Sequence, residues 1–234
     1  MIQVFPADKR YYANHGWLQS YFSFSFAEYF DRNNMNFGPL RVLNDDVVKP
    51  LQGFGEHPHQ EMEIVSIVLS GLLKHEDSLG NTAVTTFGGI QRMSAGTGIT
   101  HSEVNPSATE DVNFLQLWFL PEEYGLTPSY EQTNFDVEKL KNQLLPVVSK
   151  NPDSKGVAHI HQDLTIYLSE LEIDKTITFT QAKGRRIFLF VIEGNLTVNS
   201  DTVLNKRDSA RITNIHELTL TANSHSRFML IDLP

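Results

Sequence analysis

The stretch that decides the fold spans residues 55–71 and reads GEHPHQEMEIVSIVLSG. In a β-strand, side chains two residues apart point to the same side. Alternation therefore predicts one shared face for four polar residues, namely His57, His59, Glu61 and Glu63. The same face continues with three apolar residues, Val65, Ile67 and Leu69. The pattern predicts two imidazoles and up to two carboxylates at one end of an apolar β interior.

Period-two patterns continue on both sides of this stretch. Phe22, Phe24 and Phe26 alternate with serines, which is typical of strands. Further strands are expected over residues 63–75, 82–87, 90–94 and 112–119. Turn-forming residues at 77–81 and at Gly88-Gly89 separate them. Short strands at short, regular spacing predict a β-barrel or a β-sandwich.

The chain then divides into two blocks. Prolines interrupt a polar connection over residues 121–157, in which Asp136 to Leu145 is expected to form one short helix. A second β-rich block follows, and its residues 187–194 repeat the strand–Gly–strand outline of residues 64–71. We therefore expect an all-β protein of two related barrels. The expected domains are residues 1–130 and residues 131–234, the latter comprising the connection and the second barrel.

The composition excludes several classes of protein. The 234 residues include 19 Lys and Arg against 28 Asp and Glu, a net charge of -9 that argues against direct binding to nucleic acid or to an anionic membrane. The absence of cysteine excludes disulfides, thiolate nucleophiles and thiolate-bound metals. The amino terminus lacks a secretory pattern, and the longest apolar run, Ile187 to Ile192, is far too short to span a bilayer. We expect a cytoplasmic protein.

A second polar motif, AGTGITHSEVN, occupies residues 95–105 and places His101 and Glu103 on a common strand face. With His57 and His59, these residues offer three neutral imidazoles and one carboxylate. That donor set suits iron, manganese, nickel, copper or zinc and leaves coordination positions open. A His-x-His pair alone is more often a surface or hydrogen-bonded core pair. The addition of a glycine-flanked His-x-Glu favours a metal site.

These motifs resemble those of a known family. The spacing His57-x-His59-x-x-x-Glu63, followed by Gly98, His101 and Asn105, is similar to the two cupin motifs. The closer resemblance is to the pirin family of bicupins, particularly its bacterial members with quercetin 2,3-dioxygenase activity. It covers essentially the whole chain and is carried by residues 17–30, 37–42, 57–59, 75–81, 91–98, 116–118, 121 and 130–132. Departures are Gly96, where the general cupin motif has proline, and Gln60-Glu61-Met62.

The resemblance implies that one metal ion is held by His57, His59, His101 and Glu103. The usual cupin takes its carboxylate from the position of Glu63, whereas pirins take it from that of Glu103, so Glu61 and Glu63 are expected in supporting or solvated positions. The second barrel is expected to lack a metal, because Thr180, Ala182 and Arg186 stand at the ligand positions. The pair His159 and His161 is expected at a strand edge. The other histidines are expected to be structural or solvated, namely His15, His216, His225 and His75, which is expected to begin a turn.

The activity that the resemblance implies is the opening of a flavonol such as quercetin by dioxygen, with release of carbon monoxide. The metal would polarise the 3-hydroxyl of the flavonol, and Glu103, as catalytic base, would accept its proton. Iron is the expected metal, with zinc, manganese, nickel, copper and cobalt as alternatives, and a monomer is expected. Because animal pirins are nuclear coregulators, the alternative is a metal-dependent regulatory protein that acts through protein contacts. A redox-sensing cupin is a third reading.

Overall fold

The computed structural model describes residues 1–234, and its regular structure consists of β-strands and two short 3₁₀ turns. The chain packs as two units. The unit called here the N-terminal barrel comprises Tyr11–Phe135 and Lys150–Gln162. The C-terminal barrel comprises Met1–Arg10, Asp136–Ser149 and Asp163–Pro234. The expectation of an all-β protein with two cupin domains is confirmed.

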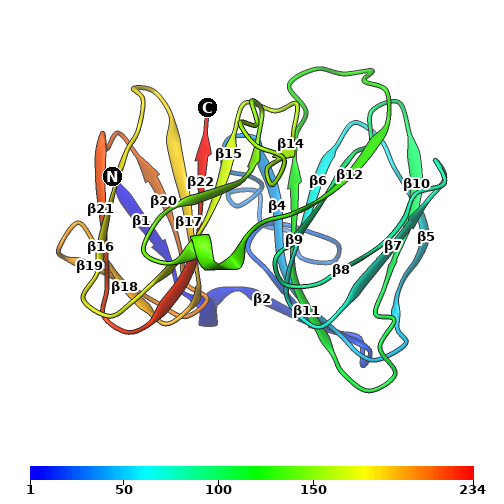
Figure 1. Ribbon diagram of the computed structural model, residues 1–234, viewed down its shortest axis with the longest axis horizontal. Helices are drawn as coiled ribbons and strands as arrows, with labels where there is room; N and C mark the ends of the chain where they lie inside the picture. The colour runs from blue at the N-terminus through cyan, green and yellow to red at the C-terminus, as the bar shows by residue number, and fades with distance from the viewer. The chain divides into compact units, whose positions relative to one another are not determined.

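Neither unit is continuous in sequence, and the expected domain boundary after residue 130 stays a prediction. The first strand, β1 (Ile2–Phe5), pairs with β20 (Ser209–Thr213) near the other end of the chain. In Figure 1 this blue strand lies among the yellow-to-red strands of the C-terminal barrel. Conversely, residues 150–162 belong to the N-terminal barrel, where the backbone N–H of His161 donates to the Glu63 carboxylate. Both exchanges depend on long-range hydrogen bonds that a local sequence pattern does not encode.

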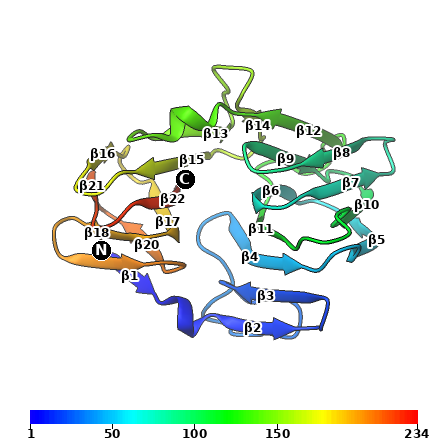
Figure 2. The ribbon, with the colours of Figure 1, turned by 60° about the horizontal axis from the view of Figure 1, so that its bottom comes forward.

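Two antiparallel sheets build the N-terminal barrel (Figure 2). The larger has the order β12 (Ser129–Asn134), β9 (Gly89–Ser94), β6 (Glu63–Ser70), β11 (Val112–Phe119), β4 (Leu40–Val48), β3 (Leu18–Phe22) and β2 (Tyr11–Asn14). The smaller has the order β5 (Gly53–His59), β10 (Ile99–Val104), β7 (Leu73–Asp77) and β8 (Thr82–Thr85). The single strand expected over residues 63–75 is therefore a hairpin, because Gly71 turns the chain between β6 and β7.

The stretch at 55–71 does not form one strand, and the prediction of one shared face for its polar residues is wrong for Glu61 and Glu63. Strand β5 ends at His59, and β6 begins at Glu63 in the other sheet. Between them Glu61 has φ 50°, which breaks the alternation. The Glu61 carboxylate accepts a hydrogen bond from the Gly125 N–H, and Glu63 bonds to His161.

The C-terminal barrel repeats the two-sheet arrangement. One sheet contains, in order, β1, β20, β17 (Arg186–Glu193), β22 (Ser226–Leu233), β15 (Thr165–Leu171) and β13 (Leu145–Ser149). The other has the order β16 (Thr176–Thr180), β21 (Glu217–Ala222), β18 (Asn195–Val198) and β19 (Thr202–Asn205). The short β14 (Ala158–His159) lies in the segment that belongs to the N-terminal barrel. The structure contains no helix with the length and apolar character of a membrane-spanning segment.

The second half of the sequence predicted a short helix and a repeated strand–Gly–strand outline, and the structure shows what each one forms. The helix expected over Asp136 to Leu145 is only a 3₁₀ turn, Val137–Leu140, whose cap Asp136 accepts a hydrogen bond from the Glu138 N–H. The other 3₁₀ turn is Ala7–Lys9. The repeated strand–Gly–strand outline is the same hairpin in each barrel, with φ 79° at Gly71 and φ 84° at Gly194. A Cβ at Gly71 would lie 2.5 Å from the Asp111 carbonyl oxygen, so this turn requires glycine.

The two barrels differ in what fills them. Buried residues, mostly aliphatic, form one continuous core in the C-terminal barrel, among them Ile187, Leu189, Val191, Leu204, Leu218 and Phe228. In the N-terminal barrel, by contrast, separate apolar clusters occur. One includes Val68 and Phe114, and another includes Ile64 and packs against Trp118. On the same face, the residue between these clusters is polar in both strands, Ser66 on β6 and Gln116 on β11, and both adjoin the site described next.

Candidate metal site

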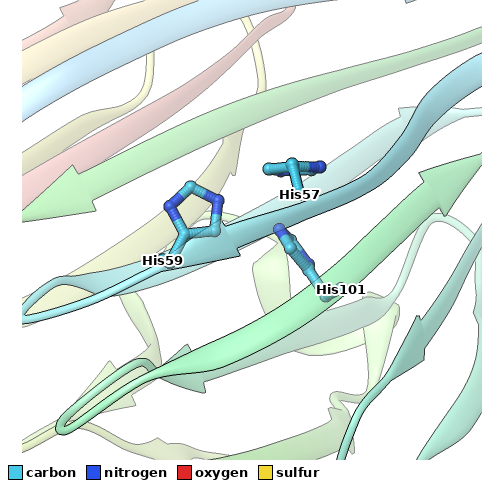
Figure 3. Close-up of side chains that lie close together, drawn as sticks. All are labelled: His57, His59 and His101. Atoms are coloured by element: carbon cyan, nitrogen blue, oxygen red, sulfur yellow. The ribbon is translucent and has the colours of Figure 1, made fainter.

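Three imidazoles meet on the smaller sheet of the N-terminal barrel, where their rings point toward one another (Figure 3). His57 and His59 lie on β5 and His101 on β10, and the ladder pairs His57 with His101. The ring centroids are 4.5 Å apart for His57 and His101 and 4.9 Å apart for the other two pairs. One nitrogen from each ring lies within 4.8 Å of the others, so the three rings can share one metal ion.

The hydrogen bonds of two of these rings leave a nitrogen lone pair for a metal. His57 Nδ1 donates to the Gly55 carbonyl oxygen at 2.7 Å, which leaves Nε2 as the unprotonated nitrogen. The ladder shifts register between His101 and Glu103 at this point, and such a bulge re-aims side chains. His101 Nε2 is buried and has no hydrogen-bond partner. Buried polar atoms are nearly always satisfied, so this orphaned nitrogen fits a metal ion as its partner.

Burial keeps two of the site imidazoles, those of His59 and His101, neutral at neutral pH. Together with the neighbouring His57, it lowers the pKa of His101 to about 2 and that of His59 to about 4. Neutral rings are the form that binds a metal. The rings of His59 and His101 are therefore in the metal-binding form at neutral pH.

Glu103 lies beside the imidazoles but groups with His101 and His75 rather than with all three site rings. It is buried, and burial raises the pKa of its carboxyl. Both oxygens are held: Ser66 Oγ donates to Oε1 at 2.9 Å, and Gln116 Nε2 donates to Oε2 at 2.5 Å. All four predicted ligands thus line one cavity, but only the three histidines form a single donor group, and Glu103 is held by hydrogen bonds from the larger sheet.

A row of polar side chains crosses the larger sheet behind Glu103 and was not singled out from the sequence. The ladders align Asn44 on β4 with Gln116 on β11, then with Ser66 on β6 and Gln91 on β9. Tyr130 extends the row by donating its hydroxyl to Gln91 Oε1 at 2.7 Å. The sequence feature that could have revealed this row is a polar residue within an otherwise apolar, buried strand, as Ser66 is within Ile64–Leu69.

His75 is a second residue that the sequence reading misplaced. It was expected at the start of a turn, but it lies in β7, is only 2% exposed, and stacks on Tyr130 with ring centroids 4.2 Å apart. Its Nε2 lies 3.0 Å from Asp77 Oδ2 and its Nδ1 lies 3.4 Å from His101 Nδ1. His75 therefore adjoins the site directly.

The other candidates lie elsewhere. Glu63, in the carboxylate position of the usual cupin, is 1% exposed and bonds to His161 Nδ1 at 3.0 Å, outside both groups of clustered donors. His159 lies in β14 at a strand edge, as expected. His15 is half-exposed near Glu28, and His225 pairs with Glu170 in the C-terminal barrel.

The imidazoles open onto a cavity of about 410 Å³ inside the N-terminal barrel. Its walls are largely aromatic, with Trp17, Phe22, Phe26, Phe54 and Trp118. The wall from β3 and β4 adds Ser20, Asn44 and Asp46. Ser20 Oγ donates to Asp46, yet burial dominates and raises the pKa of Asp46 to about 7. The cavity thus combines largely aromatic walls with a few polar groups.

Comparison with known proteins gives the family. The family model of Pirin matches residues 5–119, and that of the quercetinase C-terminal cupin domain matches residues 146–233. A quercetin 2,3-dioxygenase of Escherichia coli (strain K12) is 44% identical over 235 residues, with 100% of this chain and 99% of the relative covered. The chain belongs to the pirin family. The resemblance stated from the sequence motifs is confirmed.

Other pirin relatives agree over the full length. A pirin-like protein of Caulobacter vibrioides is 38% identical and covers 99% of this chain and 99% of its own. The crystal structure of a bacterial pirin of Escherichia coli in complex with nickel(II) has a TM-score of 0.94 at 43% identity, covering 100% of this chain and 99% of that chain. This pirin-family chain is therefore a homologue of quercetin 2,3-dioxygenases, and its histidine cluster is a candidate metal site.

Proposed function

We propose that this pirin-family chain is a metal-dependent quercetin 2,3-dioxygenase that opens a flavonol with dioxygen and releases carbon monoxide. The observation that carries the proposal is the convergence of three imidazoles on an aromatic-walled cavity. The cavity volume of about 410 Å³ falls within the ~300–1,000 Å³ of small-molecule sites. The 44% identity to a quercetin 2,3-dioxygenase over the whole chain supports the same reaction.

We propose His57, His59, His101 and Glu103 as the metal ligands and iron as the metal, with zinc, manganese, nickel, copper and cobalt as alternatives. The orphaned His101 Nε2 and the nitrogen-rich donor set support this assignment. A divalent metal held there supplies Lewis acidity to the 3-hydroxyl oxygen of the flavonol. Affinity does not select iron, because the Irving–Williams order favours nickel and copper over iron.

Glu103 is the proposed catalytic base for the 3-hydroxyl proton. Its raised carboxyl pKa makes it a stronger proton acceptor than an exposed glutamate. The Ser66 hydroxyl lies 2.9 Å from Glu103 Oε1 and 3.1 Å from Gln116 Oε1, and it has one hydrogen to donate. When Oε1 takes a proton, Ser66 can turn its hydrogen to Gln116 and accept from Glu103. The network therefore accommodates both protonation states without moving the carboxyl group.

The aromatic walls orient the substrate and exclude water. The Trp118 ring packs edge to face against His59 and against Phe26, with ring centroids 4.8 Å and 5.3 Å apart. One indole therefore contacts both the candidate metal site and the cavity wall. Across the cavity Trp17 and Phe54 pack edge to face at 5.3 Å. Flat aromatic surfaces of this kind fit the fused rings of a flavonol.

The test is oxygen-dependent consumption of quercetin by protein reconstituted with Fe(II), and separately with the other metals. We expect many turnovers per metal. The variant Glu103→Gln should keep the protein folded and lower turnover by about 100-fold or more, the usual contribution of a general base. Consumption that stops at one quercetin per protein would contradict an enzyme and point to a binding protein. A wild-type rate in Glu103→Gln would remove Glu103 as the base.

Two further inferences from the sequence remain predictions. A monomer is tested by light scattering of the metal-loaded protein. A cytoplasmic location is tested by fractionation of the source cells.

A further inference from the structure

A buried chain of hydrogen bonds runs from the loop after β7 into the candidate metal site. Asp77 closes that loop: its Oδ1 accepts from the N–H groups of Leu79 and Asn81 at 2.9 and 3.1 Å, and its Oδ2 accepts from Asn81 Nδ2 at 2.9 Å. Its Oδ2 is also 3.0 Å from His75 Nε2. The side chains of His75 and Asp77 are 2% and 0% exposed, so water does not compete for these bonds.

The direction of each bond follows from what the atoms can donate. Burial would raise the pKa of Asp77, but the bonds from His75, Asn81 and Leu79 outweigh it and hold the pKa low, so Asp77 is an acceptor only. His75 Nε2 therefore carries a hydrogen, and in the ring with one hydrogen Nδ1 bears a lone pair. That lone pair faces His101 Nδ1 at 3.4 Å, which must then donate.

The hydrogen on Nδ1 determines the state of the other ring nitrogen of His101. With the hydrogen on Nδ1, its Nε2 is the unprotonated nitrogen, and Nε2 is the buried atom that has no partner in the protein. Stacking on Tyr130, with the ring planes only 13° apart, holds the His75 ring in the required orientation. The ladder places His101 opposite Asp77 and Glu103 opposite His75. Strand pairing therefore also fixes the hydrogen-bonded chain Asp77–His75–His101, which is called the relay below.

We propose that Asp77 and His75 are positioning residues that set the tautomer and the ring orientation of His101, so that its Nε2 is presented to the metal. The inference rests on the proposed metal site but not on the proposed reaction with a flavonol. Partners of this kind raise metal affinity by about 10–100-fold.

A single substitution, Asp77→Asn, is expected to reverse the hydrogen bonds of the relay. An asparagine at position 77 keeps the shape of Asp77, and its oxygen can still accept from Leu79 and Asn81. Its amide group then faces His75 Nε2 with a hydrogen, which drives the His75 proton to Nδ1 and forces His101 to place its own proton on Nε2. The change His75→Phe is complementary, because it keeps a ring to stack on Tyr130 but removes both nitrogens.

The experiment measures metal affinity without any flavonol, by competition of Zn²⁺ and Ni²⁺ with a chromogenic chelator, for wild type, Asp77→Asn, His75→Phe and the control Glu76→Gln. Glu76 lies between the two relay residues but is half-exposed and pairs with Lys74 at 3.0 Å. We expect a loss of about 10–100-fold in affinity for both relay variants and less than twofold for the control. Wild-type affinity in both folded relay variants would overturn the proposal.

A spectroscopic measurement on the wild-type protein tests the proposal independently of whether the variants fold. Nitrogen-15 NMR of the histidine rings in the metal-free protein should show the His101 hydrogen on Nδ1, and it should move in Asp77→Asn but not in Glu76→Gln. A hydrogen on Nε2 of His101 in the wild type would refute the relay. If the wild type binds no metal yet shows the Nδ1 hydrogen, the proposed function fails while the relay stands.

Discussion

Replacing Asp46 by asparagine is expected to remove a pH-dependent loss of stability from the N-terminal barrel. Asp46 is 3% exposed on β4, and burial, with Asp45 and Glu103 nearby, raises its pKa from 3.8 to about 7 despite the hydrogen bond from Ser20. The folded state thus holds a proton that the unfolded chain releases near pH 4. A raised folded-state pKa gives stability that is complete below pH 3.8 and lost as the pH rises through 7. The shift of roughly three pKa units corresponds to about 4 kcal/mol.

The assay is urea unfolding of the metal-free protein between pH 4 and 8, followed by tryptophan fluorescence. Both tryptophans of the chain, Trp17 and Trp118, lie in the N-terminal barrel, so the signal reports this barrel alone. The free energy of unfolding of Asp46→Asn, minus that of wild type, should rise by up to about 4 kcal/mol across this range. Glu76→Gln controls for the loss of one charge. Parallel profiles for wild type and Asp46→Asn would refute the reasoning.

Three other predictions concern the site. Because burial holds the pKa of His59 near 4, metal binding at pH 5.5 should release fewer than three protons per ion, measured calorimetrically in buffers of different ionisation enthalpy; a release of three would contradict neutral rings at His59 and His101. Gln116→Leu removes the donor to Glu103 Oε2 and should lower the free energy of unfolding by about 1–3 kcal/mol, with turnover also reduced. Glu63→Gln should bind one metal per chain as wild type does, since Glu63 bonds to His161; loss of metal would return Glu63 to the ligand set.

The local alternation of strands predicted the parts of the fold and site that depend on neighbouring residues. His57 with His59, and His101 with Glu103, lie two apart on strands β5 and β10, so each pair faces the same interior. The alternation failed where the chain leaves a strand, because the left-handed backbone at Glu61 cannot be read from a period of two. The expected helix after Asp136 failed in a similar way: its cap formed, but the turn ended at Leu140.

The parts that could not be predicted depend on register between strands distant in sequence. Ser66 and Gln116 look like isolated polar residues in apolar strands, and only the β6–β11 ladder brings both to Glu103. His75 looks like the start of a turn until β7 pairs with β10 and places it against His101. The ligands were therefore predictable from motifs, whereas the residues that hold the ligands were not.

The most direct test of the central claim is the amount of carbon monoxide released per quercetin consumed, measured at increasing metal occupancy. The account predicts one carbon monoxide per quercetin, a rate proportional to bound metal, and loss of both metal and turnover in His101→Ala. The control His225→Ala, which changes an exposed histidine of the C-terminal barrel, should match wild type. Quercetin loss without carbon monoxide, or full turnover by His101→Ala, would contradict the account.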